Sequence, residues 1–369
     1  MQTETDNKKD PEIPPGAAES APRPVQQKYK RLKIFVLAAV VLACLAGMLA
    51  LLRWARLPLA EKLSLPGVST PRPGESQSIQ FPTPPEPANP AGQAVCGNEK
   101  EWFVLLVGLD SRELGTEYLY GMADVIRMIR VDFTAPSVNV ISLPRGLLVN
   151  IPEERLLVKG PVLINEAYFY GTRGMGHYKG TAYGAGSLAE TIQYNFGITS
   201  NHYLVVNFQA FVSFVDAIGG IDLDLPTYVD DMPNAYFPAG KQHLDGTQAL
   251  ILARIRRKYS DLHRINDQTL IIDAILQKLK DPAILPKMPE IYASLKDAVI
   301  TDFSPAQLET LRCLFSKLGD KKVSFFDPGW DLLTEDWEFI PTLKIKMQIE
   351  RWDQHFVDWM YASLWSNRQ

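Results

Sequence analysis

The segment DLHRINDQTLIIDAILQKL, residues 261–279, repeats its apolar side chains with the period of an α-helix. This spacing predicts an amphipathic helix that begins near Asp261 and packs its apolar face against a core. That face consists of Ile265, Ile272, Ile275, Leu276 and Leu279. Such a helix needs a second layer to bury it, and the segments that precede it in the chain can supply one.

Three polar residues, Asp261, Arg264 and Gln268, lie on this same face, although an exposed ion-pair face would lie opposite. We therefore expect them to point into the protein or into a cleft. A buried arginine needs an anion as its partner. Two alternatives stay open at this point: an internal Asp261–Arg264 pair that orders the start of the helix, or a site for a bound anion.

Short continuous apolar runs precede the helix and are typical of strands covered on both faces. The expected strands are FVLLVG after Trp102, then 125–133, 137–143 and 202–208. Helical spacing occurs at 187–195, at 209–218 and through TQALILAR before Arg254. This alternation predicts an α/β fold, a three-layer α/β/α sandwich. Residues 282–369 are expected to complete the same domain, which spans 99–369.

Near the N-terminus, residues 34–52 run nineteen positions without a charge. At about 1.5 Å per residue such a helix approaches the roughly 30 Å hydrocarbon core of a bilayer, which predicts one transmembrane helix. A cleavable signal peptide is the competing interpretation, disfavoured by the long polar leader. Basic residues crowd the N-terminal flank, so residues 1–33 are expected to be a disordered cytoplasmic tail. Residues 53–98, rich in proline, are expected to be an extracytoplasmic linker.

Composition narrows the classes of function. A formal net charge of −4 gives no basic excess, so nucleic acid is not expected as a partner. Cys44 lies inside the apolar segment, which leaves Cys96 and Cys313 as the pair available to an extracytoplasmic domain. We predict a disulfide between them, the alternative being that Cys313 is a small core residue on a helix.

Charged residues stand where the predicted strands end. Asp110 and Arg112 follow FVLLVG, Asp124 precedes the next strand, and Arg145 follows 137–143. Arg254 and Arg256 alternate in ARIRR, just before the 261–279 helix. Carboxylates and arginines around one crevice match the needs of a diphosphate with a divalent cation. Each residue alone could instead be a cap, a surface ion pair or part of a solvated basic turn.

The order of these segments is the basis of a resemblance. VGLDSRE, GMADVIRMIRVDF, SLPRG, INEAYFYG, NFQAFVSFVDAIGGIDLDLP, LARIRRKYSDLHRINDQ and AVITDFSPAQ follow one another along roughly 102–310. Together they resemble the successive motifs of the LytR-CpsA-Psr family, whose members attach lipid-carried glycopolymers to the bacterial cell wall. That family is typically anchored in the cell membrane by one N-terminal helix, with its domain outside.

The resemblance implies a phosphotransferase for cell wall biogenesis. Its donor would be a polyprenyl-diphosphate-linked glycan, with the lipid in an apolar channel, and its acceptor would be peptidoglycan. Matched residue by residue, Asp110 and Asp124 correspond to magnesium-associated aspartates, and Asp261 to the aspartate that opens the same helix. The diphosphate-binding set corresponds to Arg112, Arg145, Arg254, Arg256, Arg264 and Gln268. Asp124, Arg145 and Arg256 would act at the reacting centre.

The chain also departs from the family pattern. Where the family commonly has RSD, this chain has Met122, Ala123 and Asp124, so one arginine is missing, for which Arg112 or Arg127 could substitute. Gly146 replaces the aspartate of PRD, and Asp267 replaces the second arginine of RxxRQ. The alternative to an active transferase is therefore a weak or inactive protein that binds polyprenyl phosphate or wall glycan.

Overall fold

The structure is a computed structural model. It describes residues 47, 53, 56–66, 79–86, 92–111, 121–231, 235–255, 261–287, 291, 299–318 and 323–366. The chain divides into two compact units, Met1–Ala55 and Arg56–Gln369. The predicted tail 1–33 and, apart from Gly47, the predicted membrane helix 34–52 lie outside the described residues. Within the described residues, no helix has both the length and the apolar character needed to span a bilayer.

The second unit is built on a six-stranded mixed sheet with the order β11-β6-β1-β2-β3-β12. Strand β1 pairs antiparallel with β2 and parallel with β6, while β3 pairs antiparallel with β2 and parallel with β12. The strands are β1 Glu101–Leu109, β2 Ala123–Asp132, β3 Ser137–Ser142, β6 His202–Asn207, β11 Val299–Thr301 and β12 Val323–Phe326. These directions bring the ends of β1, β3, β6 and β12 and the start of β2 to one edge of the sheet, called here the site edge.

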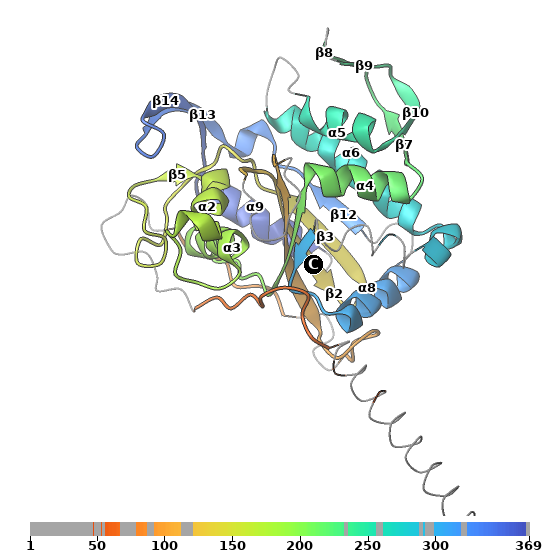
Figure 1. The fold of residues 1–369 in the computed structure, drawn as a ribbon. Helices are drawn as coiled ribbons and strands as arrows, with labels where there is room; N and C mark the ends of the chain where they lie inside the picture. The colour runs from red at the N-terminus through yellow and green to blue at the C-terminus, as the bar shows by residue number, and fades with distance from the viewer. Residues whose placement is uncertain are drawn as a thin grey trace, which may run out of the picture. The chain divides into compact units, whose positions relative to one another are not determined.

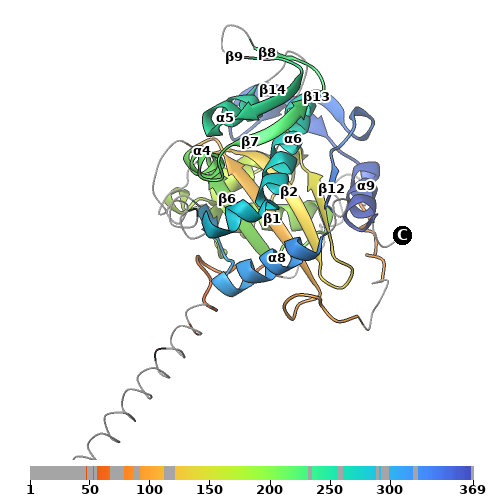
Figure 2. The same cartoon turned by 90° about the vertical axis from the view of Figure 1, so that its right-hand side faces the viewer.

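Helices cover both faces of the sheet (Figures 1 and 2). One face, which carries Leu105 and Met128, shares a buried core with α2, α3 and α9. The opposite face is covered by α4, α5, α6 and α8. The helices are α2 Ile164–Gly171, α3 Tyr183–Phe196, α4 Phe208–Ala217, α5 Gly246–Arg254, α6 Asp261–Leu279, α8 Pro305–Lys317 and α9 Gln354–Leu364. The predicted α/β/α sandwich and the helix beginning at Asp261 are confirmed.

Smaller elements surround this sandwich. Four two-stranded sheets pair β4 Leu148–Val149 with β5 Val162–Leu163, β7 Ile221–Leu225 with β10 Gly240–Leu244, β8 Val229–Asp231 with β9 Ala235–Phe237, and β13 Thr334–Ile340 with β14 Ile345–Arg351. Short 3₁₀ turns occupy η1 Arg173–Met175, η2 Pro282–Lys287 and η3 Trp330–Leu332. Residues 282–369 thus supply both edge strands of the six-stranded sheet, β11 and β12. They also supply the covering helices α8 and α9 and the β13–β14 hairpin.

A disulfide joins Cys96, just before β1, to Cys313 in the middle of α8. The two Cα atoms lie 6.0 Å apart, within the usual range for a disulfide. Ser304 and Gln307 form a capping box at the start of α8, which fixes the helix at its other end. The predicted pairing is confirmed, and α8 is tied to the segment that enters the central strand.

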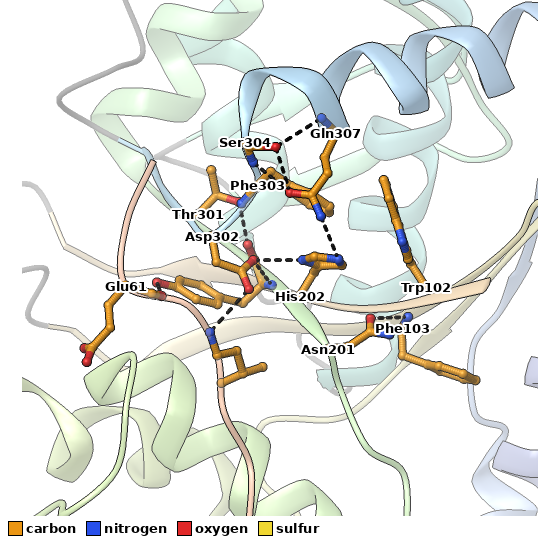
Figure 3. A network of polar contacts seen from close by, with 12 residues as sticks. Glu61, Trp102, Phe103, Asn201, His202, Thr301, Asp302, Phe303, Ser304 and Gln307 are labelled. Atoms are coloured by element: carbon orange, nitrogen blue, oxygen red, sulfur yellow. Dashed lines mark hydrogen bonds and ion pairs between the residues drawn. The ribbon is translucent and has the colours of Figure 1, made fainter. Parts of the chain in front are cut away.

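A buried polar network holds the chain that precedes the domain against the edge of the sheet opposite the site edge (Figure 3). Asp302, directly after β11, accepts a hydrogen bond from the backbone N–H of Tyr203 at 3.1 Å and from that of Leu63 at 3.4 Å. Its Oδ1 also lies 3.3 Å from Nδ1 of His202. Residues 56–66, inside the range predicted as a linker, therefore pack on the domain.

Candidate functional site

An apolar cavity of about 450 Å³ lies between the sheet and helices α4, α5, α6 and α8. Aliphatic and aromatic side chains from all of these elements line it, among them Leu106, Val206, Phe211, Ile272, Leu276 and Phe315. The apolar face of α6 predicted from its periodicity supplies one wall, because Ile272, Ile275, Leu276 and Leu279 all line the cavity. The cavity can therefore hold an apolar chain shielded from water.

Polar residues reach this cavity at the site edge. Asp124 stands at the start of β2, Asn207 at the end of β6, Arg254 at the end of α5, and Gln268 on α6. The strand residues toward the opposite edge, such as Val131, are apolar. A molecule that fills the cavity would thus place a charged group at one end and hydrocarbon at the other.

Three of the predicted residues, Asp124, Arg145 and Arg264, form what is called here the arginine–aspartate cluster. Oδ1 of Asp124 lies 2.7 Å from Nη1 of Arg145, which sits in the loop after β3. The other carboxylate oxygen of Asp124, Oδ2, lies 4.0 Å from Nη1 of Arg264. Arg264 is on α6 and is 3% exposed. Segments far apart in the sequence, two strand ends and one helix, are thereby brought together.

A second arginine lies close to Arg264 inside the protein. The buried Arg127 donates to Asp327 at 3.3 Å and to the carbonyl of Ile265 at 3.1 Å. Burial lowers the pKa of Arg127 to about 10, an effect that Asp327 opposes and the charge of Arg264 adds to. Asp327 also accepts hydrogen bonds from the hydroxyls of Ser142 and Thr269. Arg127 is therefore anchored beneath the cluster.

Arg254 on α5 and Gln268 on α6, two further predicted residues, line the cavity. Gln268 donates a hydrogen bond from Nε2 to the carbonyl of Ala253 at 3.1 Å, which joins the two helices. The guanidinium of Arg254 is exposed and lies 4.5 Å from the ring centroid of Phe208. Its charge is thus available to an anion at the site edge.

Asp110 directly follows β1, whose last residue, Leu109, pairs with Ala123, the residue before Asp124 on β2. Its side chain is exposed, and Oδ1 accepts the backbone N–H of Met122 at 2.7 Å. Carboxylate oxygens are the ligands that magnesium prefers. Among the described residues there is no group of three or more potential metal ligands. A magnesium ion held by these two carboxylates would need further oxygen ligands, which a bound diphosphate can supply.

The loop after β3 explains one departure from the family pattern. The backbone N–H of Glu350, on β14, donates to the carbonyl of Gly146 at 2.9 Å. A Cβ atom added to Gly146 would lie 2.5 Å from Oε2 of Glu350, too close for both to stay in place. The carboxylate of Glu350 thus occupies the space that a side chain at position 146 would take.

Two members of the predicted set, Arg112 and Arg256, lie outside the described residues. Of Asp261 only the backbone is described, at the first position of α6. Sequence reasoning missed Asp327, which carries no motif and becomes recognisable only once β12 is paired beside β3.

These features define a three-layer α/β domain in which an apolar cavity leads to arginines and carboxylates at one sheet edge. The chain belongs to the LytR-CpsA-Psr family, whose family model matches residues 77–330. It is 25% identical over 244 residues to the polyisoprenyl-teichoic acid–peptidoglycan teichoic acid transferase TagV of Bacillus subtilis, covering 64% of this chain and 58% of that protein.

A second relative has a name of the same kind. The transferase of the same kind named TagU from Oceanobacillus iheyensis is 28% identical over 211 residues, covering 56% of this chain and 61% of that protein. The chain thus spans about three fifths of the length of these relatives.

Solved structures show the same fold. The crystal structure of Bacillus subtilis TagV has a TM-score of 0.57 at 21% identity, covering 73% of this chain and 98% of that one. TagT bound to LI-WTA has a TM-score of 0.54 at 19% identity, covering 75% and 96%.

Proposed function

We propose that this protein is a phosphotransferase of cell wall assembly that attaches a polyprenyl-diphosphate-linked glycopolymer to peptidoglycan. The observation that carries the proposal is the apolar cavity that ends at the arginine–aspartate cluster. A lipid diphosphate matches this cavity, because it consists of a long hydrocarbon joined to a compact anion. The names of the relatives, transferases between polyisoprenyl-linked teichoic acid and peptidoglycan, support the same donor and acceptor.

In the proposed reaction, a hydroxyl of a peptidoglycan sugar attacks the phosphorus next to the glycan. A new P–O bond to the acceptor forms, the P–O bond to the bridging oxygen breaks, polyprenyl phosphate leaves, and one proton is released. Arg145, Arg254 and Arg264 would hold the diphosphate oxygens, with Arg112, Arg256 and Gln268 completing the set. Asp124 orients Arg145 through their 2.7 Å contact. Such fixed donors stabilise the charge that develops during phosphoryl transfer.

Magnesium is part of this proposal. Asp110 and Asp124 would hold the ion, which would neutralise diphosphate charge when bound. Placement is proposed as well: residues 34–52 span the cell membrane once, the N-terminus is cytoplasmic, and the domain faces the wall. The partners are then membrane lipid, the lipid-linked glycan and peptidoglycan, with no nucleic acid.

The second candidate function is binding of polyprenyl phosphate or wall glycan without turnover. Met122 favours it, because its position offers no guanidinium and the nearby Arg127 is committed to Asp327. The glycine at position 146 does not favour this binding function, because the carboxylate of Glu350 already occupies the space that an aspartate side chain would take there.

The test is a transfer assay with the full-length chain in detergent, a synthetic polyprenyl diphosphate-linked glycan, peptidoglycan and magnesium. We expect polyprenyl phosphate to be released in step with glycan attachment, and mass spectrometry to find prenyl lipid in the purified protein. Bound lipid with no release would select the binding function. Release that is undiminished in Arg145→Ala would reject the proposed site.

A further inference from the structure

The β13–β14 hairpin has two different faces. One face packs on the domain, where Ile340 and Ile349 are 0% and 1% exposed and share a small core with Leu163 of β5. Because side chains alternate along a strand, the intervening residues must point the other way. The hairpin is thus attached through Ile340 and Ile349, while residues 335, 337 and 339 on the opposite face of β13 are exposed.

The solvent face carries two large aromatic side chains. Trp337 is 60% exposed and Phe339 is 53% exposed, two positions apart on β13. In the pairing with β14, Gln348 stands opposite Trp337 and Lys346 stands opposite Phe339, and both are exposed. Two rings, an amide, an ammonium group and the carboxylate of Glu335, two positions before Trp337, therefore share one surface, called here the aromatic face.

The aromatic face is connected to the candidate site. Glu350, near the end of β14, donates its N–H to the carbonyl of Gly146, and Leu147 bridges to the same residue. Gly146 directly follows Arg145 of the arginine–aspartate cluster. Residues 334–351 also lie beyond 77–330, the part that the family model matches. The hairpin therefore lies next to the site edge and outside the residues that the family model matches.

Charge distinguishes between possible occupants of this face. Residues 334–351 contain four acidic residues against three basic ones. A surface that binds a polyphosphate chain or an anionic membrane would need an excess of cations. Sugar rings need no such excess, because their C–H faces stack on aromatic rings while hydroxyl and acetamido groups bond to amides and amines. The composition of the aromatic face fits an uncharged saccharide.

We propose that the aromatic face binds the glycan strand of the peptidoglycan acceptor and guides it to the arginine–aspartate cluster. This inference rests on the proposed function for the identity of the acceptor. Trp337 and Phe339 stack on successive sugars, and Gln348 and Lys346 bond to their polar groups. These residues bind the acceptor and have no part in holding the lipid diphosphate.

The experiment compares full-length wild type with Trp337→Ala, Phe339→Ala and Trp337→Tyr. Ile345→Ala is the matched control, because Ile345 is 52% exposed on the same hairpin but pairs with Ile340 of the attached face. Binding is measured by calorimetry with soluble oligomers of N-acetylglucosamine, which present the sugar rings and acetamido groups of the glycan strand without any charge. We expect each alanine variant at 337 or 339 to bind about 10-fold more weakly, as the loss of one aromatic contact predicts. The tyrosine variant and the control should bind like wild type.

The transfer assay separates this inference from the proposed function. If both are right, the alanine variants raise KM for the acceptor and leave KM for the lipid-linked donor unchanged. Glycan binding that depends on Trp337 in a protein without transfer activity would reject the proposed function and keep the aromatic face. Wild-type protein that binds no glycan, or alanine variants that bind as well as wild type, would overturn the inference. Trp337-dependent binding to lipid vesicles or self-association, without glycan binding, would also overturn it.

Discussion

Nη1 of Arg145 lies 2.7 Å from Oδ1 of Asp124, so a guanidinium placed after β3 meets a carboxylate at the start of β2. The contact joins two neighbouring strands at the edge where the apolar cavity opens. Asp124 holds Arg145 in place, and the second carboxylate oxygen of Asp124 lies 4.0 Å from Nη1 of Arg264.

Replacing Arg145 with alanine should slow transfer by about 10²- to 10³-fold, the usual effect of removing one donor that stabilises developing charge. Stability should fall by about 1 to 3 kcal/mol, because the two side chains are only 18% and 19% exposed and removing the arginine takes a charged partner from a largely buried carboxylate. Transfer rate and urea unfolding measure the two effects. Arg155→Ala, which breaks the Arg155–Glu190 pair outside the cluster, is the control. Equal loss of activity in both variants would contradict the assignment.

Met122→Arg should raise turnover and affinity for the lipid diphosphate. Arg127 cannot fill the missing position without leaving Asp327 and the carbonyl of Ile265. An added guanidinium can restore up to about 10²-fold in rate if it reaches the same phosphate oxygens. Steady-state kinetics with the lipid-linked donor is the measurement. Unchanged kinetics would mean that another group already serves there.

Filling the apolar cavity should prevent lipid binding. Ala253 lines the cavity on α5, so Ala253→Phe would place a ring inside it. Ile251→Phe is the control, because Ile251 is 38% exposed on the same helix. We expect co-purified prenyl lipid, measured by mass spectrometry, to fall in the first variant only. Thermal unfolding should show whether overpacking, which typically costs about 1 to 3 kcal/mol, accounts for the loss.

Replacing Cys96 with serine should lower the free energy of unfolding by about 3 to 5 kcal/mol, because the disulfide closes a loop across most of the domain. Urea unfolding with and without a reducing agent measures this loss. Wild type under reducing conditions should match the variant. A wild-type protein that is equally stable with and without reductant would refute the prediction.

Glu166 should make stability depend on pH. Burial raises its pKa, although the Leu163 N–H and the Thr342 and Tyr170 hydroxyls lower it. A carboxyl whose folded pKa exceeds its unfolded value retains its proton longer in the folded state, so stability falls as pH rises between the two values. Glu166→Gln should remove that fall. Urea unfolding of both proteins from about pH 4 upward tests it, and parallel pH curves would contradict it.

The main layers of the fold could be predicted from the sequence because each buried element has a strong local pattern. Strands β1, β2, β3 and β6 are rich in apolar and β-branched residues, and α6 repeats its apolar residues at helical spacing. Edge strands β11 and β12 are only three and four residues long and become strands through pairing with distant partners. Short segments of this kind carry little signal of their own.

The side of the sheet on which a residue lies was harder to predict. Arg127 sits in a strand buried on both faces, so no alternation of polar and apolar residues shows its direction. In the structure, the hydrogen bonds that Arg127 donates to Asp327 and to the carbonyl of Ile265 show to which side its side chain points. Arg264 and Gln268 could be placed correctly, because a helix with one apolar stripe defines its buried side.

The bond between Cys96 and Cys313 makes one covalent circle of the chain from the entry of β1 to the middle of α8. A protease that cuts any single peptide bond within that circle divides the polypeptide but releases no fragment. The two pieces stay joined, and the central sheet, α2 to α6 and the first half of α8 remain on one molecule. On an electrophoresis gel such a nicked protein migrates as a single species until a thiol is added. For a domain proposed to face the cell wall, where proteases can reach its loops, a single cut within this circle therefore leaves all parts of the fold covalently joined.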